Sequence, residues 1–251
     1  MNPQALQRVV VRMLYDPGLV EAVHAGTPVE GLDDAGRAHL VRIDRRAWAT
    51  DAYRRSRTLQ ALIEELPVSS ARAGIDQLDA FFSSEDFHSA VQERRAMVLA
   101  FARWLEPQVG DIARLEGAIA RARQQSPRTG SGLCMAVGVS AVSLPEGLFS
   151  WWQEAKGQLG PTPLCALLES PVELGTPPAG PSTEHYLLDR GSDGGIQLGG
   201  GSASLVGLLC AADSPISLEA LADRAVALGA EPSEVSEIIQ GLVLDGLLIQ
   251  A

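Results

Sequence analysis

Basic residues are almost missing from the second half of this chain. Residues 128–251 contain 4 Lys+Arg against 14 Asp+Glu, a net charge of −10, and the chain's single lysine, Lys156, is one of the four. Residues 1–127 contain 16 Arg against 17 acidic residues, a net charge of −1. This difference indicates two parts with different surfaces. Because proteins that bind DNA neutralise phosphates with Lys and Arg, the acidic half argues against nucleic acid as a partner.

Cysteines and long apolar runs are also scarce. No apolar run approaches the roughly 20 residues that are needed to span a bilayer. The first residues, MNPQALQRVVVRMLYDP, contain no apolar core followed by a small-residue cleavage site. We therefore expect a cytoplasmic protein with no membrane partner. A reducing compartment also suits the three widely spaced cysteines, which fit neither a disulfide framework nor a CxxC metal site: Cys134, Cys165 and Cys210.

Reactive side chains do not form a recognisable catalytic motif. The nearest cluster, Glu85-Asp86-Phe87-His88, is typical of a helix start that Ser83 or Ser84 caps. The glycine-rich GSDGGIQLGGG favours a turn over a phosphate-binding loop. We expect no catalytic residue, no metal site and no cofactor, with the alternative that isolated residues assemble into a site in space. The histidines lack metal-ligand spacing such as HExxH: His24, His39, His88 and His185.

The apolar spacing of residues 1–127 predicts helices throughout, followed by a mixed region. We predict an α+β protein with an N-terminal helical domain at 1–127. A connector of mixed strand and helix, with a Pro/Gly-rich loop, follows at 128–183, and a C-terminal domain at 184–251. Pro107 is expected to separate the last two helices. The candidate helices span 3–14, 17–24, 33–57, 58–66, 70–82, 89–105 and 109–125.

Residues 184–251 have the element order of a winged helix, with a β-hairpin and three helices. The hairpin is predicted by EHYLLDRGSDGGIQLGGG, where two apolar runs flank a turn signal. Ser217 can cap the second helix, and Gly246 can end the third in a left-handed conformation before a short last strand. Residues 226–251 contain no Lys or Arg, so a third helix that reads DNA is disfavoured.

The C-terminal segments HYLLDRGSDGGIQLGGG, LVGLLCAADSPISLEALADRA and VSEIIQGLVLDGLLI resemble the precursor-recognition domains of ribosomal-peptide biosynthesis. The resemblance implies that a peptide adds a strand to the hairpin edge and packs beside the third helix. The predicted edge is Ile196, Gln197 and Leu198. The alternative is that the apolar positions of the third helix are core residues. In the peptide-binding interpretation, the groove is formed by Val235, Ile239 and Leu242.

Six arginines lie between residues 42 and 57, together with Trp48 and Tyr53. Acidic residues are interleaved with them, so one interpretation is a long solvated helix with i,i+4 ion pairs. Another is a protein interface, because Arg, Trp and Tyr are enriched in interface hot spots. Stacking on nucleic-acid bases is a third possibility.

The segments YRRSRTLQALIEELPVS, FFSSEDFHSAVQERRA and FARWLEP resemble the helical domain of a family of bacterial accessory proteins. These proteins are partner subunits of multinuclear non-heme iron oxidases in methanobactin and 3-thiaglutamate biosynthesis. The resemblance implies a heterodimer in which iron belongs to the oxidase. We predict that the docking face includes Arg45, Trp48, Tyr53 and Arg55.

Taken together, these features predict a non-catalytic partner subunit. It would bind a ribosomally made precursor peptide and an iron-dependent oxidase, and present the peptide for oxidative modification. Tethering the peptide raises its local concentration near the metal. The alternative is a winged-helix transcription regulator that contacts DNA only as an oligomer.

Overall fold

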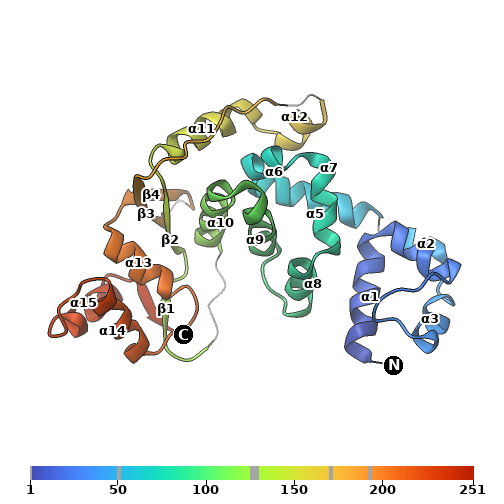
Figure 1. Ribbon diagram of the computed structural model, residues 1–251, viewed down its shortest axis with the longest axis horizontal. Helices are drawn as coiled ribbons and strands as arrows, with labels where there is room; N and C mark the ends of the chain where they lie inside the picture. Colours follow the sequence, from blue (N-terminus) through green and yellow to red (C-terminus); the bar gives the residue numbers. More distant parts are fainter. Residues whose placement is uncertain (1, 50–51, 125–129, 170–171, 192–193) are drawn as a thin grey trace. The chain divides into compact units, whose positions relative to one another are not determined.

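The computed structural model describes residues 2–49, 52–124, 130–169, 172–191 and 194–251. Over this part the protein is mainly helical with small antiparallel sheets, which confirms the predicted α+β class (Figure 1).

The chain forms two compact units, and both are discontinuous in sequence. The first comprises Met1–Val109 and Gln158–Glu173, and the second comprises Gly110–Gly157 and Leu174–Ala251. These limits differ from the three predicted segments. The last helix of the N-terminal half joins the second unit, and most of the predicted connector is divided between the two.

The first unit is helical throughout its described residues. Its elements are α1 (Pro3–Tyr15), α2 (Pro17–Ala25), α3 (Asp34–Leu40), α4 (Arg45–Ala49), α5 (Ala52–Glu65), α6 (Pro67–Ala73), α7 (Ile75–Leu78), the 3-10 helix η1 (Asp79–Ser83), α8 (Glu85–Gln92), α9 (Met97–Val109) and α12 (Pro163–Glu169).

Short polar side chains set several helix starts. The hydroxyl of Ser84 accepts a hydrogen bond from the Phe87 N–H at 3.2 Å, which confirms the predicted cap of α8. Asp16 follows α1 directly and caps α2, where its carboxylate accepts from the Leu19 N–H at 3.1 Å. A single side chain therefore fixes the corner between α1 and α2.

Two predicted long helices are interrupted. The segment 33–57 is not one helix but contains α3, α4 and the start of α5. The Asp44 carboxylate accepts from the Arg46 N–H at 2.9 Å, and this local bond begins α4 after a turn. The arginines of this region are therefore distributed over short helices, and the prediction of one long solvated helix was wrong.

The segment 89–105 is likewise divided between α8 and α9. Arg94 lies between them with a left-handed φ of 54°, which no helix interior tolerates. Pro107 does not end α9, as predicted, but lies within its last turns, and the helix stops before Gly110 at φ 61°. Proline position alone was insufficient to locate this boundary.

An aromatic cluster forms the centre of the first unit. Phe81 is fully buried, and its ring centroid lies 4.9 Å from that of Phe101, 5.5 Å from Phe87 and 5.6 Å from Trp104. Phe82 stacks on Tyr15 at 5.2 Å. The cluster joins α1, η1, α8 and α9, so it holds together segments that are far apart in sequence.

His88 is buried beside this cluster, and burial together with the nearby Arg12 guanidinium lowers its pKa. The unfolded chain restores the ordinary value of about 6.5 and therefore takes up a proton more readily. The neutral, buried imidazole therefore stabilises the folded protein above the ordinary pKa. This contribution is lost as the pH falls from the ordinary pKa toward the lowered pKa of the folded state. We expect the urea midpoint of the protein to fall between about pH 7.5 and about pH 5.5.

Replacing His88 with glutamine should reduce this pH dependence. The exposed His39 provides the matched control, because His39→Gln should leave the pH profile unchanged. Equal profiles for wild type and His88→Gln would contradict the prediction.

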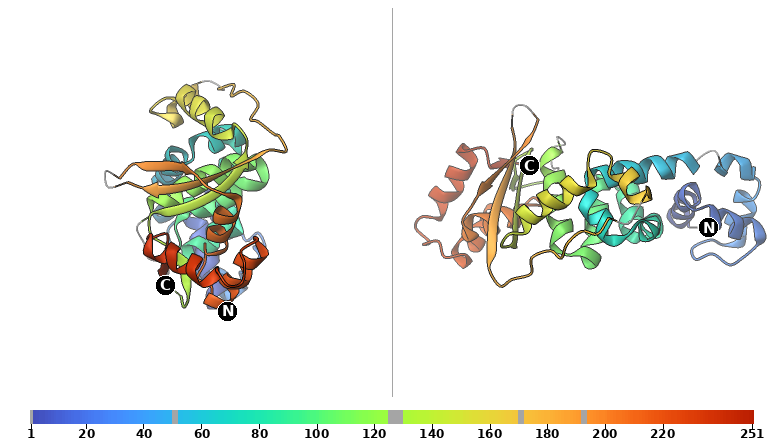
Figure 2. Two further views of the ribbon diagram at one scale, coloured as in Figure 1. Left: turned by 90° about the vertical axis from the view of Figure 1, so that its left-hand side faces the viewer. Right: turned by 90° about the horizontal axis from the view of Figure 1, so that it is seen from above.

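The second unit contains a three-stranded antiparallel sheet in the order β2-β3-β4 (Figure 2). β2 (Val139–Pro145) pairs with β3 (Thr183–Arg190), and β3 pairs with β4 (Ile196–Gly200). β3 and β4 form the predicted hairpin, although residues 192 and 193 of its turn lie outside the described part. The third strand, β2, comes from the segment that was predicted to be a connector.

Helices cover both faces of this sheet. α13 packs against one face, where Val139, Ala141 and Leu187 join the core. α10 lies on the other (Figure 2), and the Trp152 indole N–H donates to the buried Glu116 carboxylate at 2.9 Å. The helices of this unit are α10 (Asp111–Arg123), α11 (Leu148–Leu159), α13 (Ala203–Ala211), α14 (Leu218–Ala227) and α15 (Val235–Leu244). The predicted caps are confirmed, since Ser217 caps α14 and Gly246 follows α15 at φ 71°.

A second, two-stranded sheet pairs β1 (Leu133–Met135) with β5 (Leu248–Gln250). Gly132 lies at its end with a φ of 119°, and a Cβ atom there would stand 2.3 Å from the Ile216 carbonyl oxygen. The backbone can follow this path only because the residue has no side chain. The last predicted strand is therefore confirmed, and its partner is β1.

Candidate functional site

The outer edge of β4 is unpaired within the described part of the chain, because β3 is its only strand neighbour there. The Gly191 N–H donates to the Gly195 carbonyl, and the Gly201 N–H donates to the His185 carbonyl. These bonds show which residues of β4 turn their backbone groups toward β3 and which turn them outward. By this alternation Gln197 pairs with β3, whereas the backbone groups of Ile196 and Leu198 point outward. The predicted edge residues thus lie on an open strand edge.

The predicted groove residues occupy a different environment. Val235, Ile239 and Leu242 are 6%, 4% and 8% exposed, and all three belong to the core of the second unit. α15 packs against α14 and β5. In this structure Val235, Ile239 and Leu242 are therefore core residues, as the alternative interpretation predicted. The large apolar side chains that α15 exposes are instead Ile238, Val243 and Leu244.

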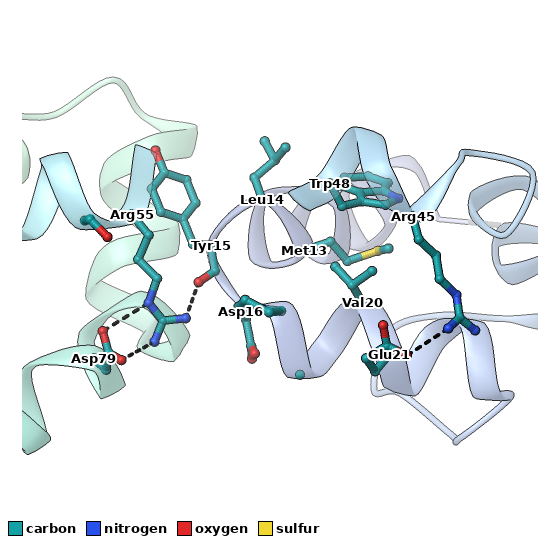
Figure 3. Close-up of a pocket in the computed structure, with 13 residues that line it drawn as sticks. Met13, Leu14, Tyr15, Asp16, Val20, Glu21, Arg45, Trp48, Arg55 and Asp79 are labelled. Carbon is teal, nitrogen blue, oxygen red and sulfur yellow. Dashed lines mark hydrogen bonds and ion pairs between the residues drawn. The ribbon is translucent and has the colours of Figure 1, made fainter. Parts of the chain in front are cut away.

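Three of the predicted docking residues line one pocket of about 600 Å³ in the first unit, which we call the α1–α2 pocket (Figure 3). Arg45 lies on one side, where its Nη1 is 3.0 Å from Glu21 Oε2. Both side chains of this ion pair are more than half exposed, with values of 53% and 66%. Such a pair contributes little stability and can be rearranged by a ligand.

Arg55 lies on the opposite side of the pocket and has a structural role. Its guanidinium donates to both carboxylate oxygens of Asp79, at 3.0 Å from Nε and 2.7 Å from Nη2, and it also donates to the Tyr15 carbonyl. The same group lies 5.4 Å from the centroid of Phe82. These bonds tie α5 to η1 and to the end of α1, so Arg55 is not a freely presented interface arginine.

Trp48 forms part of the pocket wall and is only 8% exposed. It packs in a core cluster with Met13, Val20 and Leu40, which the sequence did not indicate. Tertiary packing therefore buries most of the indole of this predicted docking residue. The side chain of Tyr53 lies outside the described residues.

A further polar cluster lies between β2 and β3. Ser143 Oγ and His185 Nδ1 are 2.8 Å apart, although 42 positions separate them in sequence. On the opposite face of β3, the Tyr186 hydroxyl donates to Glu184 at 2.7 Å and, with the Gly147 N–H, lowers the pKa of that carboxyl. Burial and this carboxylate raise the pKa of Tyr186 to about 12, so the phenol remains a donor. Only the strand register brings these residues together, which explains why the sequence did not reveal the pair.

The described part of the chain contains no group of three or more His, Cys, Asp or Glu side chains that could hold a metal ion. None of its helices is both long enough and apolar enough to cross a membrane.

Comparison with known proteins finds no matching family model and no curated protein with significant sequence similarity.

Proposed function

We propose that this chain is a non-catalytic partner subunit in ribosomal-peptide biosynthesis. It binds a precursor peptide and a multinuclear non-heme iron oxidase, and presents the peptide for oxidative modification. The observation that carries the proposal is the unpaired edge of β4 within the described residues. An edge of this kind offers backbone donors and acceptors to an added strand.

In this proposal the hairpin β3–β4 and helices α13 to α15 act as a winged-helix recognition domain. The peptide extends the sheet by bonding to the outward backbone groups of Ile196 and Leu198. Residues 191–251 contain one basic residue, Arg224, against eight acidic ones. This surplus of negative charge favours a leader segment that is neutral or basic.

Oxidase docking is proposed for the first unit, at the exposed turn before α4. Val41 and Ile43 are 39% and 37% exposed there, and Arg45 follows them. Exposed apolar side chains beside arginine are typical of protein interfaces. We propose a cytoplasmic heterodimer in which iron is bound by the oxidase.

Replacing Leu198 with proline should weaken peptide binding by about tenfold or more. Proline removes an N–H that points outward, and its ring obstructs an added strand. The β3–β4 ladder should persist, because the lost donor is not one that β3 uses. Fluorescence anisotropy with a labelled, extended leader peptide of neutral or basic charge measures the change.

Leu198→Ala is the matched control because it removes the side chain and retains the N–H. A loss of about threefold or less is expected for it. Strand addition is disproved if Leu198→Pro binds normally, or if both variants lose affinity equally while circular dichroism shows both folded.

The partner role is tested by co-expression with a multinuclear non-heme iron oxidase, followed by size-exclusion chromatography with light scattering and metal analysis. We expect a one-to-one complex whose iron stays with the larger subunit when the two are separated. A symmetric dimer that elutes alone and retards DNA would overturn the proposal in favour of a transcription regulator.

A further inference from the structure

Among the described residues that line the α1–α2 pocket, one carboxylate has no arginine partner, although it caps α2. Glu21 is paired with Arg45, and Asp79 is paired with Arg55. Asp16 lies between these two ion pairs (Figure 3), and among the described residues its carboxylate bonds only to the Leu19 N–H. The described lining residues therefore carry three carboxylates against two arginines, a net charge of −1.

The nearest arginine along the chain does not neutralise Asp16. Arg12 precedes it by one helical turn but is absent from the pocket lining, and it acts on His88. Asp16 itself is half-buried at the corner between α1 and α2. A partly buried carboxylate of this kind favours a cation that brings hydrogen-bond donors.

Most of the remaining described wall of the pocket is apolar, and Ser56 adds a polar side chain. Met13, Leu14, Val20 and Trp48 lie along it, and the indole offers an aromatic surface. Their arrangement suits an apolar stem, and aromatic faces also attract cations. The pocket volume of about 600 Å³ is within the range of ordinary ligand sites.

We infer that the α1–α2 pocket binds a primary ammonium group on an apolar stem, as in a lysine side chain of a partner protein. Asp16 is the counter-ion, and the wall formed by Val20 and Trp48 receives the stem. Arg55 positions the corner by holding Asp79 and the Tyr15 carbonyl. This inference goes beyond the peptide site on β4 and is independent of whether that site exists.

The test uses three probes that differ only in their end group: 4-phenylbutylammonium, 4-phenylbutanol and 4-phenylbutanoate. Binding to the full-length protein is followed by the indole N–H signal of Trp48 in proton–nitrogen NMR spectra. The chain has four tryptophans, so Trp48→Phe assigns the signal. We expect saturable binding of the ammonium, with a Kd near 1 mM, and roughly tenfold weaker binding of the other two probes.

Asp16→Asn removes the charge and keeps the α2 cap, because Asn and Asp cap helices equally well. It should weaken ammonium binding about tenfold and leave the alcohol unchanged. Asp33→Asn is the matched control, since Asp33 caps α3 through the Gly36 N–H at 2.8 Å and does not line the pocket. If Asp16→Asn does not fold, Asp16→Ser offers a second cap without charge.

Three outcomes would overturn the inference. The first is tighter binding of the carboxylate, which would mean that Arg45 exchanges Glu21 for an anion. The second is unchanged ammonium binding by Asp16→Asn. The third is the absence of any shift of the Trp48 signal with each probe at about 10 mM. None of these results bears on the β4 edge, because every probe lacks a peptide backbone.

Discussion

Replacing Phe81 with alanine is expected to destabilise the first unit by about 4 kcal/mol, within the usual range for a buried phenylalanine. Its side chain is fully buried and contacts the rings of Phe87, Phe101 and Trp104. The substitution removes buried apolar surface and leaves a cavity. It also removes edge-to-face ring contacts, each worth about 0.5 to 1.5 kcal/mol.

The change can be followed by urea unfolding with tryptophan fluorescence, since Trp104 adjoins the altered site. Phe81→Leu is the matched control, because it retains most of the volume and should cost about half as much or less. A loss below about 1 kcal/mol for Phe81→Ala would show that this cluster is not the core of the unit.

Gly132→Ala is expected to destabilise the second unit by about 3 kcal/mol, because strain in the backbone adds to a steric conflict. The residue has a φ of 119°, and its Cβ would lie 2.3 Å from the Ile216 carbonyl oxygen. That oxygen accepts from the Leu133 N–H at 2.8 Å, and the Gly132 carbonyl accepts from the Ala251 N–H at 2.8 Å. The substitution must therefore displace backbone that holds β1 in place.

Gly157→Ala makes the same chemical change within α11, where an added Cβ meets nothing within 4 Å. Helix propensity predicts that this variant is stabilised by about 0.5 to 1 kcal/mol. Thermal unfolding of the two variants should therefore shift in opposite directions. A midpoint for Gly132→Ala equal to that of the wild type would refute the strand arrangement around β1.

Local signals in the sequence predicted local structure well. The turn signal gave the hairpin β3–β4, and Ser84 and Ser217 gave two helix starts, because these depend on neighbours within a few residues. The interruptions near Asp44 and Arg94 were missed. Around Asp44 the apolar spacing continues from Ile43 to Ala47, so periodicity alone could not locate that break. At the second break the apolar pattern is interrupted by Glu93, Arg94 and Arg95.

Pairing between distant segments was not predicted. Nothing in the composition of β1 indicates that β5 is its partner, and nothing in β2 indicates that it extends the hairpin. The same limitation applies to the candidate site. Arg45 and Arg55 were identified by residue type, but the burial of Trp48 and the position of Asp16 depend on how α1, α2 and α4 pack. Residue type indicates possible chemistry, whereas exposure is decided by packing.

The interleaving of the two units affects how the protein is made on the ribosome. β1 is synthesised roughly a hundred residues before β5, its partner, and helix α12 of the first unit lies between the two segments of the second unit, Gly110–Gly157 and Leu174–Ala251. Neither unit can acquire all of its native contacts as an early, separate product of translation. During synthesis the edges of β1 and β2 therefore remain unpaired until β5 and β3 have been made. Chaperone protection in that interval would determine the yield of folded protein.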